Sequence, residues 1–144
     1  MRVERFRVED IDLFQNYGGQ DDLVRLMPRD QVATIISTGN HYSLYSGDRI
    51  VACIGFVPVH EWRCTVWTLL QDGLPELFAG IHIVVRRLIR EQPWARIEAY
   101  VDPMSVPAVR WVTLLGFECE TPLKPYFMPD GRAASEWVFF KRAV

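Results

Sequence analysis

Hydrophobic positions recur along this chain with two periods, two residues and about 3.6 residues, and the period changes several times. Alternating or β-branched runs predict strands at residues 2–8, 41–45, 49–57, 64–70, 96–101, 117–122 and 135–142. Runs with the helical period predict helices at residues 11–17, 29–38, 74–92 and 107–115. This order contains no internal repeat or linker and predicts a single α/β (α+β) domain over residues 1–144.

The segment from residue 101 to residue 118 carries the most specific local pattern. Asp102 or Ser105 is a suitable cap for the helix that follows, and Pro107 lies in its first turn, where no N–H is needed. Gly116 then supplies the left-handed residue that ends a helix, and Phe117 begins the next strand. The segment therefore predicts a strand end, a capped helix, a glycine stop and a new strand.

Composition narrows the class of protein. The 144 residues are 49% hydrophobic, which is enough for one packed core, and the formal net charge is −2. The charges are interspersed, so we expect no nucleic-acid partner. Apolar runs are too short for a membrane span, and the amino terminus alternates instead of forming a signal peptide, so we expect no membrane association. Three cysteines without paired spacing indicate buried, reduced thiols and a cytoplasmic location.

Helix, glycine stop and element order together resemble the GNAT-type N-acetyltransferases. The run from Val101 to Glu118 is similar to the family pattern V-x-P/N-x-N-x-x-A-x-x-x-Y-x-x-x-G-F-x, and the order β-α-α-β-β-β-α-β-α-β-β matches the family's. The resemblance implies a mixed, twisted sheet of about six to seven strands with helices on both faces. It also implies that acetyl-CoA lies in a V-shaped opening between the central strands and donates an acetyl group to an amine.

The same resemblance implies which residues contact the cofactor and which do chemistry. The backbone of the central strand would hold the pantetheine arm, and the following loop would hold the pyrophosphate. The implied cofactor-binding residues are Leu69, Leu70, Gln71, Gly73, Leu74 and Ser105. The catalytic candidates are His60 and Glu61 as general bases, and Tyr100 and Tyr126 as hydroxyl groups near the same cleft. No histidine has metal-ligand spacing to a cysteine or carboxylate, so we expect no metal.

Two positions depart from the family pattern. The loop before the long helix contains one glycine, Pro75 removes a backbone donor, and Asp72 and Glu76 place carboxylates where phosphates would bind. Val112 stands where many family members have a proton-donating tyrosine. These departures leave two interpretations open, an acetyltransferase acting on an amine of a protein or small molecule, and a fold that has lost its chemistry.

Five features narrow the second interpretation: a short chain, an absent Gly-rich loop, a Trp-rich strand before an acidic helix start, an R-I-E-A-x-V-D strand and a P-D-G turn. The Trp-rich strand lies at residues 67–70, the acidic helix start at 71–77, the R-I-E-A-x-V-D strand at 96–102 and the turn at 129–131. They resemble the small GNAT-like proteins of tailed bacteriophages, some of which resemble an internal virion protein. That resemblance implies a protein partner, and a place in the host cytoplasm or the virion. Phe139 and Phe140 lie on opposite faces of the last strand, so a homodimer through that strand is a further hypothesis.

Overall fold

A seven-stranded mixed sheet, with the strand order β1-β2-β3-β4-β5-β7-β6, forms the framework of the computed structural model. The structure describes residues 1–14, 27–71 and 74–141. The chain divides into two compact units, one of residues 1–58 and 66–91, the other of residues 59–65 and 92–144. The fold class predicted from the sequence, a mixed sheet with helices, is confirmed.

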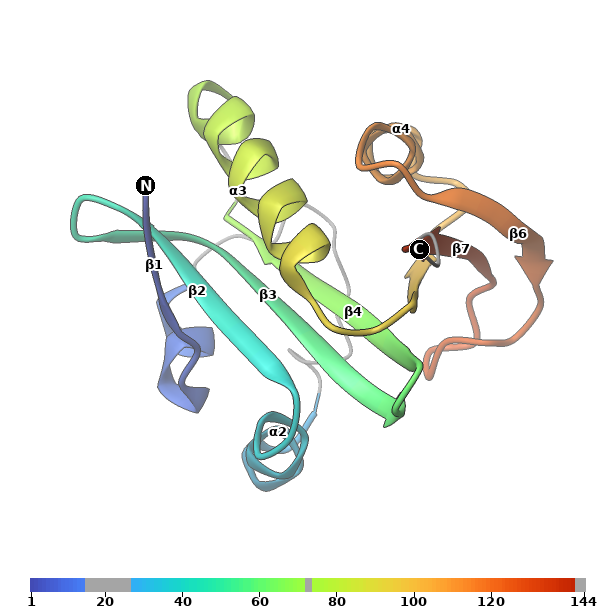
Figure 1. Ribbon diagram of the computed structural model, residues 1–144, viewed down its shortest axis with the longest axis horizontal. Helices are drawn as coiled ribbons and strands as arrows, with labels where there is room; N and C mark the ends of the chain where they lie inside the picture. Colours follow the sequence, from blue (N-terminus) through green and yellow to red (C-terminus); the bar gives the residue numbers. More distant parts are fainter. Residues whose placement is uncertain (15–26, 72–73, 142–144) are drawn as a thin grey trace. The chain divides into compact units, whose positions relative to one another are not determined.

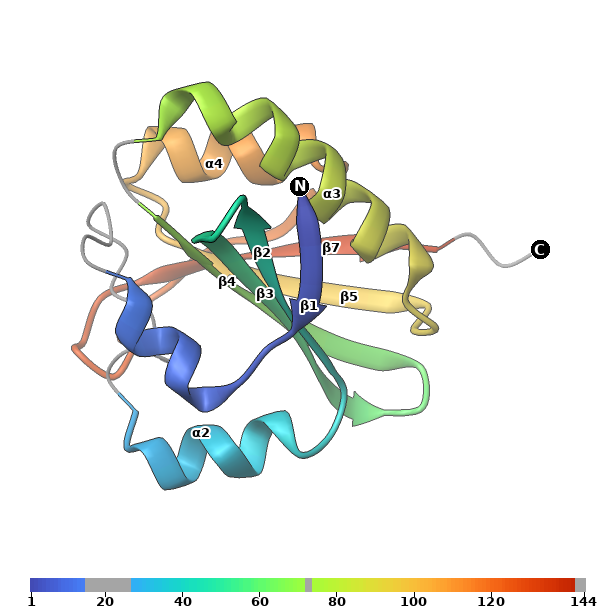
Figure 2. The ribbon, with the colours of Figure 1, turned by 90° about the vertical axis from the view of Figure 1, so that its left-hand side faces the viewer.

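The first unit is a set of antiparallel strands with helices on both faces. Its elements are β1 (Arg2–Arg5), η1 (Val8–Leu13), α2 (Arg29–Ile36), β2 (Asn40–Ser46), most of β3 (Arg49–His60), the second half of β4 (Arg63–Leu70), η2 (Pro75–Leu77) and α3 (Phe78–Glu91). β1 pairs with β2 and β2 with β3, both antiparallel. Figure 2 shows η1 and α2 below these strands and α3 above them.

Both faces of the first unit bury an apolar layer. The layer beneath η1 and α2 consists of Phe6, Ile11, Phe14, Val32, Tyr45, Ile50, Cys53 and Leu69. On the other face, α3 buries the stripe Ile81, Val84, Val85, Leu88 and Ile89. The helical period of the sequence predicted this stripe, because residues three and four apart share one face of a helix.

A buried carboxylate fastens η1 to the sheet. The hydroxyl of Ser43 on β2 donates to Asp10 Oδ2 (2.8 Å), and the backbone N–H of Arg7 donates to the same oxygen (2.9 Å). Asp10 is almost fully buried, so these donors replace the water that the carboxylate loses. η1 is thereby held over the apolar layer.

The second unit is smaller and carries one α-helix. It contains the first half of β4, β5 (Arg96–Val101), α4 (Val106–Leu114), β6 (Glu118–Lys124) and β7 (Ala134–Phe140). β4 and β5 are parallel at Arg63–Thr65 and Arg96–Glu98, whereas β7 is antiparallel to both β5 and β6. In Figure 1, α4 is drawn with the orange and red strands of this unit.

Helix α4 begins and ends as its sequence predicts. Ser105 is the N-cap, and its Oγ accepts a hydrogen bond from the backbone N–H of Ala108 (3.4 Å). The alternative cap, Asp102, instead accepts from the N–H of Met104 (2.9 Å) and shapes the preceding turn. Gly116 has φ +96°, a conformation that suits glycine, and the ring of Phe139 lies against it.

Two helix boundaries differ from the predicted ones. The helix expected over residues 74–92 begins instead as the 3-10 turn η2. Pro75 lies in this first turn and has no N–H to donate, and the N–H of Leu77 donates to Leu74 O (3.0 Å). The helix expected over residues 11–17 is replaced by the earlier 3-10 segment η1. Residues 15–17 of that prediction lie outside the described part of the chain.

Candidate functional site

β4 is the strand to which the sequence assigned the cofactor arm. Its parallel ladder with β5 covers three residue pairs, from Arg63 with Arg96 to Thr65 with Glu98, and the strand then continues to Leu70. Leu69 is fully buried in the apolar layer of the first unit, and Leu70 is half-buried. The side chains of both leucines thus make this end of β4 apolar.

Gln71 ends this strand with an unsatisfied polar atom. Its backbone N–H donates to Val51 O (2.9 Å), which fixes the residue against β3. Its side-chain Oε1 is buried and has no hydrogen-bond partner among the described residues. A buried acceptor of this kind is costly unless a donor reaches it, and the amide groups of a pantetheine arm carry such donors.

The start of α3 offers little to a diphosphate. Leu74 is the N-cap of η2 without a side-chain cap, Pro75 has no N–H, and the N–H groups of Leu77 and Phe78 are used within the turn. Glu76 adds a carboxylate to this first turn. The predicted site residue Gly73 lies outside the described residues. The described residues therefore fit the acyl and pantetheine part of acetyl-CoA better than its diphosphate.

A histidine and a glycine fix the tryptophan of β4. His41 Nε2 lies 2.8 Å from Thr38 O, so Nε2 carries the proton, and Nδ1 accepts from Trp67 Nε1 (3.3 Å). Burial lowers the pKa of His41, and the neutral ring matches these two hydrogen bonds. A methyl group on Gly55 would lie 2.2 Å from Trp67 Nε1, so this glycine makes room for the pair.

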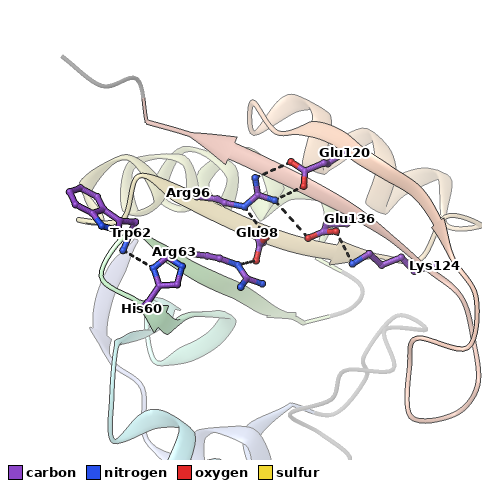
Figure 3. Close-up of polar contacts among 8 residues, drawn as sticks. All are labelled: His60, Trp62, Arg63, Arg96, Glu98, Glu120, Lys124 and Glu136. Carbon is purple, nitrogen blue, oxygen red and sulfur yellow. Dashed lines mark hydrogen bonds and ion pairs between the residues drawn. The ribbon is translucent and has the colours of Figure 1, made fainter.

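An ion-pair network centred on Glu98 crosses the strands of the second unit (Figure 3). Glu98 is 2% exposed and accepts from Arg63 Nε (2.5 Å) and Arg96 Nε (2.9 Å), one on each oxygen. Burial alone would raise the pKa of Glu98, but the two guanidinium groups outweigh it and lower the pKa. Glu98 is therefore a fixed negative charge at neutral pH.

The network continues over β6 and β7. Arg96 makes a bidentate pair with Glu120 on β6 (2.9 and 2.5 Å) and lies 3.9 Å from Glu136 on β7. Lys124 Nζ contacts the other oxygen of Glu136 at 2.7 Å. The network thus contains equal numbers of negative and positive side chains: Glu98, Glu120 and Glu136, and Arg63, Arg96 and Lys124.

Tyr100 lies at the edge of the network, two residues after Glu98 on the same side of β5. Its ring stacks at an angle on Phe127 (4.7 Å between centroids). Burial, followed by the nearby charges of Glu98 and Glu136, raises the pKa of Tyr100. The hydroxyl consequently keeps its proton at neutral pH.

The other catalytic candidates lie elsewhere. Tyr126 is 88% exposed in the β6–β7 connection and has φ 55°. His60 and Glu61 are exposed in the β3–β4 hairpin, where His60 Nδ1 accepts from Trp62 N–H (3.2 Å). Trp62 O accepts from Arg96 N–H, so this hairpin lies at the start of β5, about 13 Å along the strand from Tyr100. The structure does not bring the four candidates together.

The two positions of α4 singled out by the family pattern have structural roles. Ser105, a predicted cofactor contact, is occupied as the N-cap. Val112, at the position of the family's tyrosine, is 5% exposed and packs inward. The hydroxyl expected at this point of the family pattern is thus replaced by core packing.

Sequence reasoning missed the Glu98 network, the most developed polar feature of the described residues. Its signal was the alternation of Arg96, Glu98 and Tyr100 on one side of β5, a strand that β7 separates from the charged strand β6. No group of three metal-binding side chains occurs among the described residues. Within the same residues, no helix is long and apolar enough to cross a membrane.

Comparison with known proteins defines the fold. No protein-family model matches the chain, and no curated protein matches its sequence. Solved structures do match over nearly the full length. Ard1 from Thermoplasma volcanium is 15% identical with a TM-score of 0.74, covering 99% of this chain and 98% of that chain. The ribosomal-protein-S18-alanine N-acetyltransferase from Escherichia coli is 13% identical, with a TM-score of 0.73 and coverages of 99% and 96%.

A third match carries the family's name. A GNAT-family acetyltransferase from Bacillus anthracis is 15% identical, with a TM-score of 0.67 and coverages of 96% and 93%. The chain therefore has the GNAT fold, as its element order predicted. At these identities the likeness defines the architecture, and the chemistry has to be argued from this chain's own residues.

Proposed function

We propose that this protein is an N-acetyltransferase that moves an acetyl group from acetyl-CoA to an amine. The observation that carries the proposal is the full-length match to acetyltransferase structures, together with Gln71 Oε1 at the end of β4, which is buried and has no hydrogen-bond partner among the described residues. In the transfer, the amine nitrogen bonds to the thioester carbonyl carbon and loses a proton. The carbon–sulfur bond breaks, and the sulfur takes a proton.

Three residues are proposed to hold the donor. The apolar strand at Leu69 and Leu70 suits the pantetheine arm, and Gln71 Oε1 accepts one of its amide N–H groups. Acetyl-CoA supplies the activated acyl group when bound. Because the described start of α3 offers few donors and one carboxylate, we expect weak affinity for the diphosphate.

Tyr100 is the proposed proton donor to the leaving sulfur. Its hydroxyl stays protonated at neutral pH, and Val112 offers no hydroxyl. Replacing Tyr100 with Phe keeps the ring and removes only the hydroxyl. We therefore expect kcat to fall about 100-fold in Tyr100→Phe, the scale of a lost general acid. The matched control is Tyr126→Phe, whose exposed hydroxyl is expected to leave kcat unchanged.

A second candidate function is a binding protein that keeps the fold without catalysis. Val112 in the core and the proline at the start of η2 favour it, since both remove groups that acetyl transfer normally uses. A bacteriophage origin and a virion partner belong to this candidate and rest on the sequence pattern alone.

Release of free CoA in the presence of a panel of amines separates the two candidates. An acetyltransferase releases CoA in proportion to acetylated product, measured by mass spectrometry, and Tyr100→Phe slows both. Binding of acetyl-CoA without release for any amine favours the second candidate, and absence of both binding and release contradicts the first.

A further inference from the structure

The ammonium group of Lys124 is held by three groups of its own chain. Glu136 Oε2 lies 2.7 Å from Nζ, and the ring centroids of Tyr100 and Phe127 lie 5.4 and 5.0 Å from it. One carboxylate and two aromatic faces are the combination that recognises alkylammonium ions. Lys124 thus occupies an arrangement of groups that would suit an external ammonium equally well.

The walls of this arrangement are fixed by contacts that do not involve Lys124. Glu136 is buried on β7 and lies opposite Tyr100 in the β5–β7 ladder. The rings of Tyr100 and Phe127 contact each other directly. A site whose groups are already in place loses little free energy to ordering when a ligand binds.

The loop that carries Phe127 is also fixed. After Phe127, the N–H of Met128 donates to Arg132 O (3.0 Å), and Gly131 N–H donates to Met128 O (2.8 Å). The Arg132 guanidinium reaches Asp102 at the end of β5 (3.5 Å). The loop therefore returns to the strand that carries Tyr100.

Lys124 is the group in this arrangement whose place an external ammonium can take. It is the last residue of β6, the strand at the end of the sheet order, and it follows an irregularity between Thr121 and Lys124. Its ammonium ends a flexible four-carbon chain that can leave without breaking a backbone hydrogen bond. Arg96, 3.9 Å from the other oxygen of Glu136, stays as the remaining cation beside the carboxylate.

We infer that Tyr100, Phe127 and Glu136 form a binding cage for an alkylammonium group of a ligand, and that Lys124 fills this cage in the free chain. The existence of the cage is independent of the proposed function. Its role as part of the amine-acceptor site rests on that function.

The chemistry of the cage also says which group of an acceptor it holds. The hydrogen bond to Glu136 raises the pKa of Lys124, so an amine in the cage stays protonated. A protonated amine has no lone pair with which to attack a thioester. The cage therefore recognises a cationic group other than the reacting amine, and the acceptor class is one with a second alkylammonium group.

The test uses n-butylammonium as the probe and Lys124→Met as the variant that vacates the cage while keeping apolar packing. The chain contains one other lysine, and Lys141→Met is the matched control. Binding is followed by NMR of labelled Tyr and Phe rings. Removal of the tethered competitor is expected to tighten binding about tenfold in Lys124→Met relative to the wild type. Lys141→Met is expected to match the wild type.

Two further measurements complete the test. Adding Glu136→Gln to Lys124→Met is expected to abolish the gain, and n-butanol, which lacks the charge, is expected not to shift the rings. If Lys124→Met does not fold, the Nζ resonance of Lys124 in the wild type is followed instead, and n-butylammonium is expected to displace it.

Equal affinity of the wild type and Lys124→Met, or an unmoved Lys124 resonance at saturating probe, overturns the cage. Neither result depends on acetyl-CoA. A protein that binds n-butylammonium in this way but never acetyl-CoA would retain the cage and lose the proposed function.

Discussion

Replacement of Glu98 with Gln tests the structural centre of the second unit. Gln has nearly the same shape, so no cavity forms, but the negative charge between Arg63 and Arg96 is lost. The amide oxygen still accepts from one guanidinium, while the amide NH₂ faces the other donor. A hydrogen bond to a charged group contributes about 1.5–3 kcal/mol, and an unsatisfied buried donor costs about 1–3 kcal/mol.

Solvent moderates this cost. The side chains of Arg63 and Arg96 are 35% and 27% exposed, so water partly replaces the lost partner. We therefore expect the free energy of unfolding to fall by about 2–4 kcal/mol, a large share of the roughly 5–15 kcal/mol of a typical domain. Urea unfolding followed by tryptophan fluorescence measures this change.

The matched control is Glu120→Gln, which removes an exposed carboxylate from the same Arg96. A much smaller loss is expected there, since an exposed pair is screened by water and salt. The lowered pKa of Glu98 adds a pH test: its contribution is present above pH 4.5 and is lost as the pH falls below that value. Equal stability of Glu98→Gln and the wild type, or an equal loss in both variants, would show that the buried charge of Glu98 does not stabilise the second unit.

Three further predictions concern the first unit and the thiols. Gly55→Ala is expected to destabilise the protein by about 1–3 kcal/mol in urea unfolding, because the new methyl group meets Trp67 and His41. Gly80→Ala in α3 is expected to be neutral or stabilising, because its methyl group approaches only the end of the exposed Met1 side chain (3.3 Å), which can move. His41 has a lowered pKa, so its unfolded form binds more protons and stability is expected to fall as the pH drops below 6.5; His41→Gln should lack that component in acid titrations. Burial raises the pKa of Cys53 and Cys64 to about 12, whereas Cys119 is exposed, so the burial expected from the sequence is wrong for Cys119. Ellman's reagent at about pH 8 is therefore expected to modify only Cys119 rapidly, and Cys119→Ser should abolish the fast phase.

The local pattern of the chain was sufficient to predict the order of the elements. Capping by Ser105, the proline in the first turn and the glycine stop at Gly116 are decided by neighbouring residues, so α4 was predicted within one residue at either end. The apolar stripe of α3 was predicted for the same reason. Boundaries failed at Pro75 and in η1, where 3-10 geometry replaces the regular period.

The candidate site was less accessible to sequence reasoning. Glu98 and Glu136 are far apart in sequence, and both lie near Arg96 because of the pairing of β5 with β7, which no local pattern specifies. The cage around Lys124 depends on an irregularity of β6 and on a loop returning to β5. Such features depend on which strands pair in the folded chain. The sequence therefore shows which residue types are present but not which of them come into contact.

We propose that the chain uses its GNAT fold to bind acetyl-CoA along β4. Isothermal titration of the intact protein with acetyl-CoA tests this binding, with Gln71→Leu as the variant that removes the acceptor without a partner among the described residues. We expect one acetyl-CoA to bind per chain, with lower affinity in Gln71→Leu. Absence of any heat of binding at millimolar acetyl-CoA would contradict it.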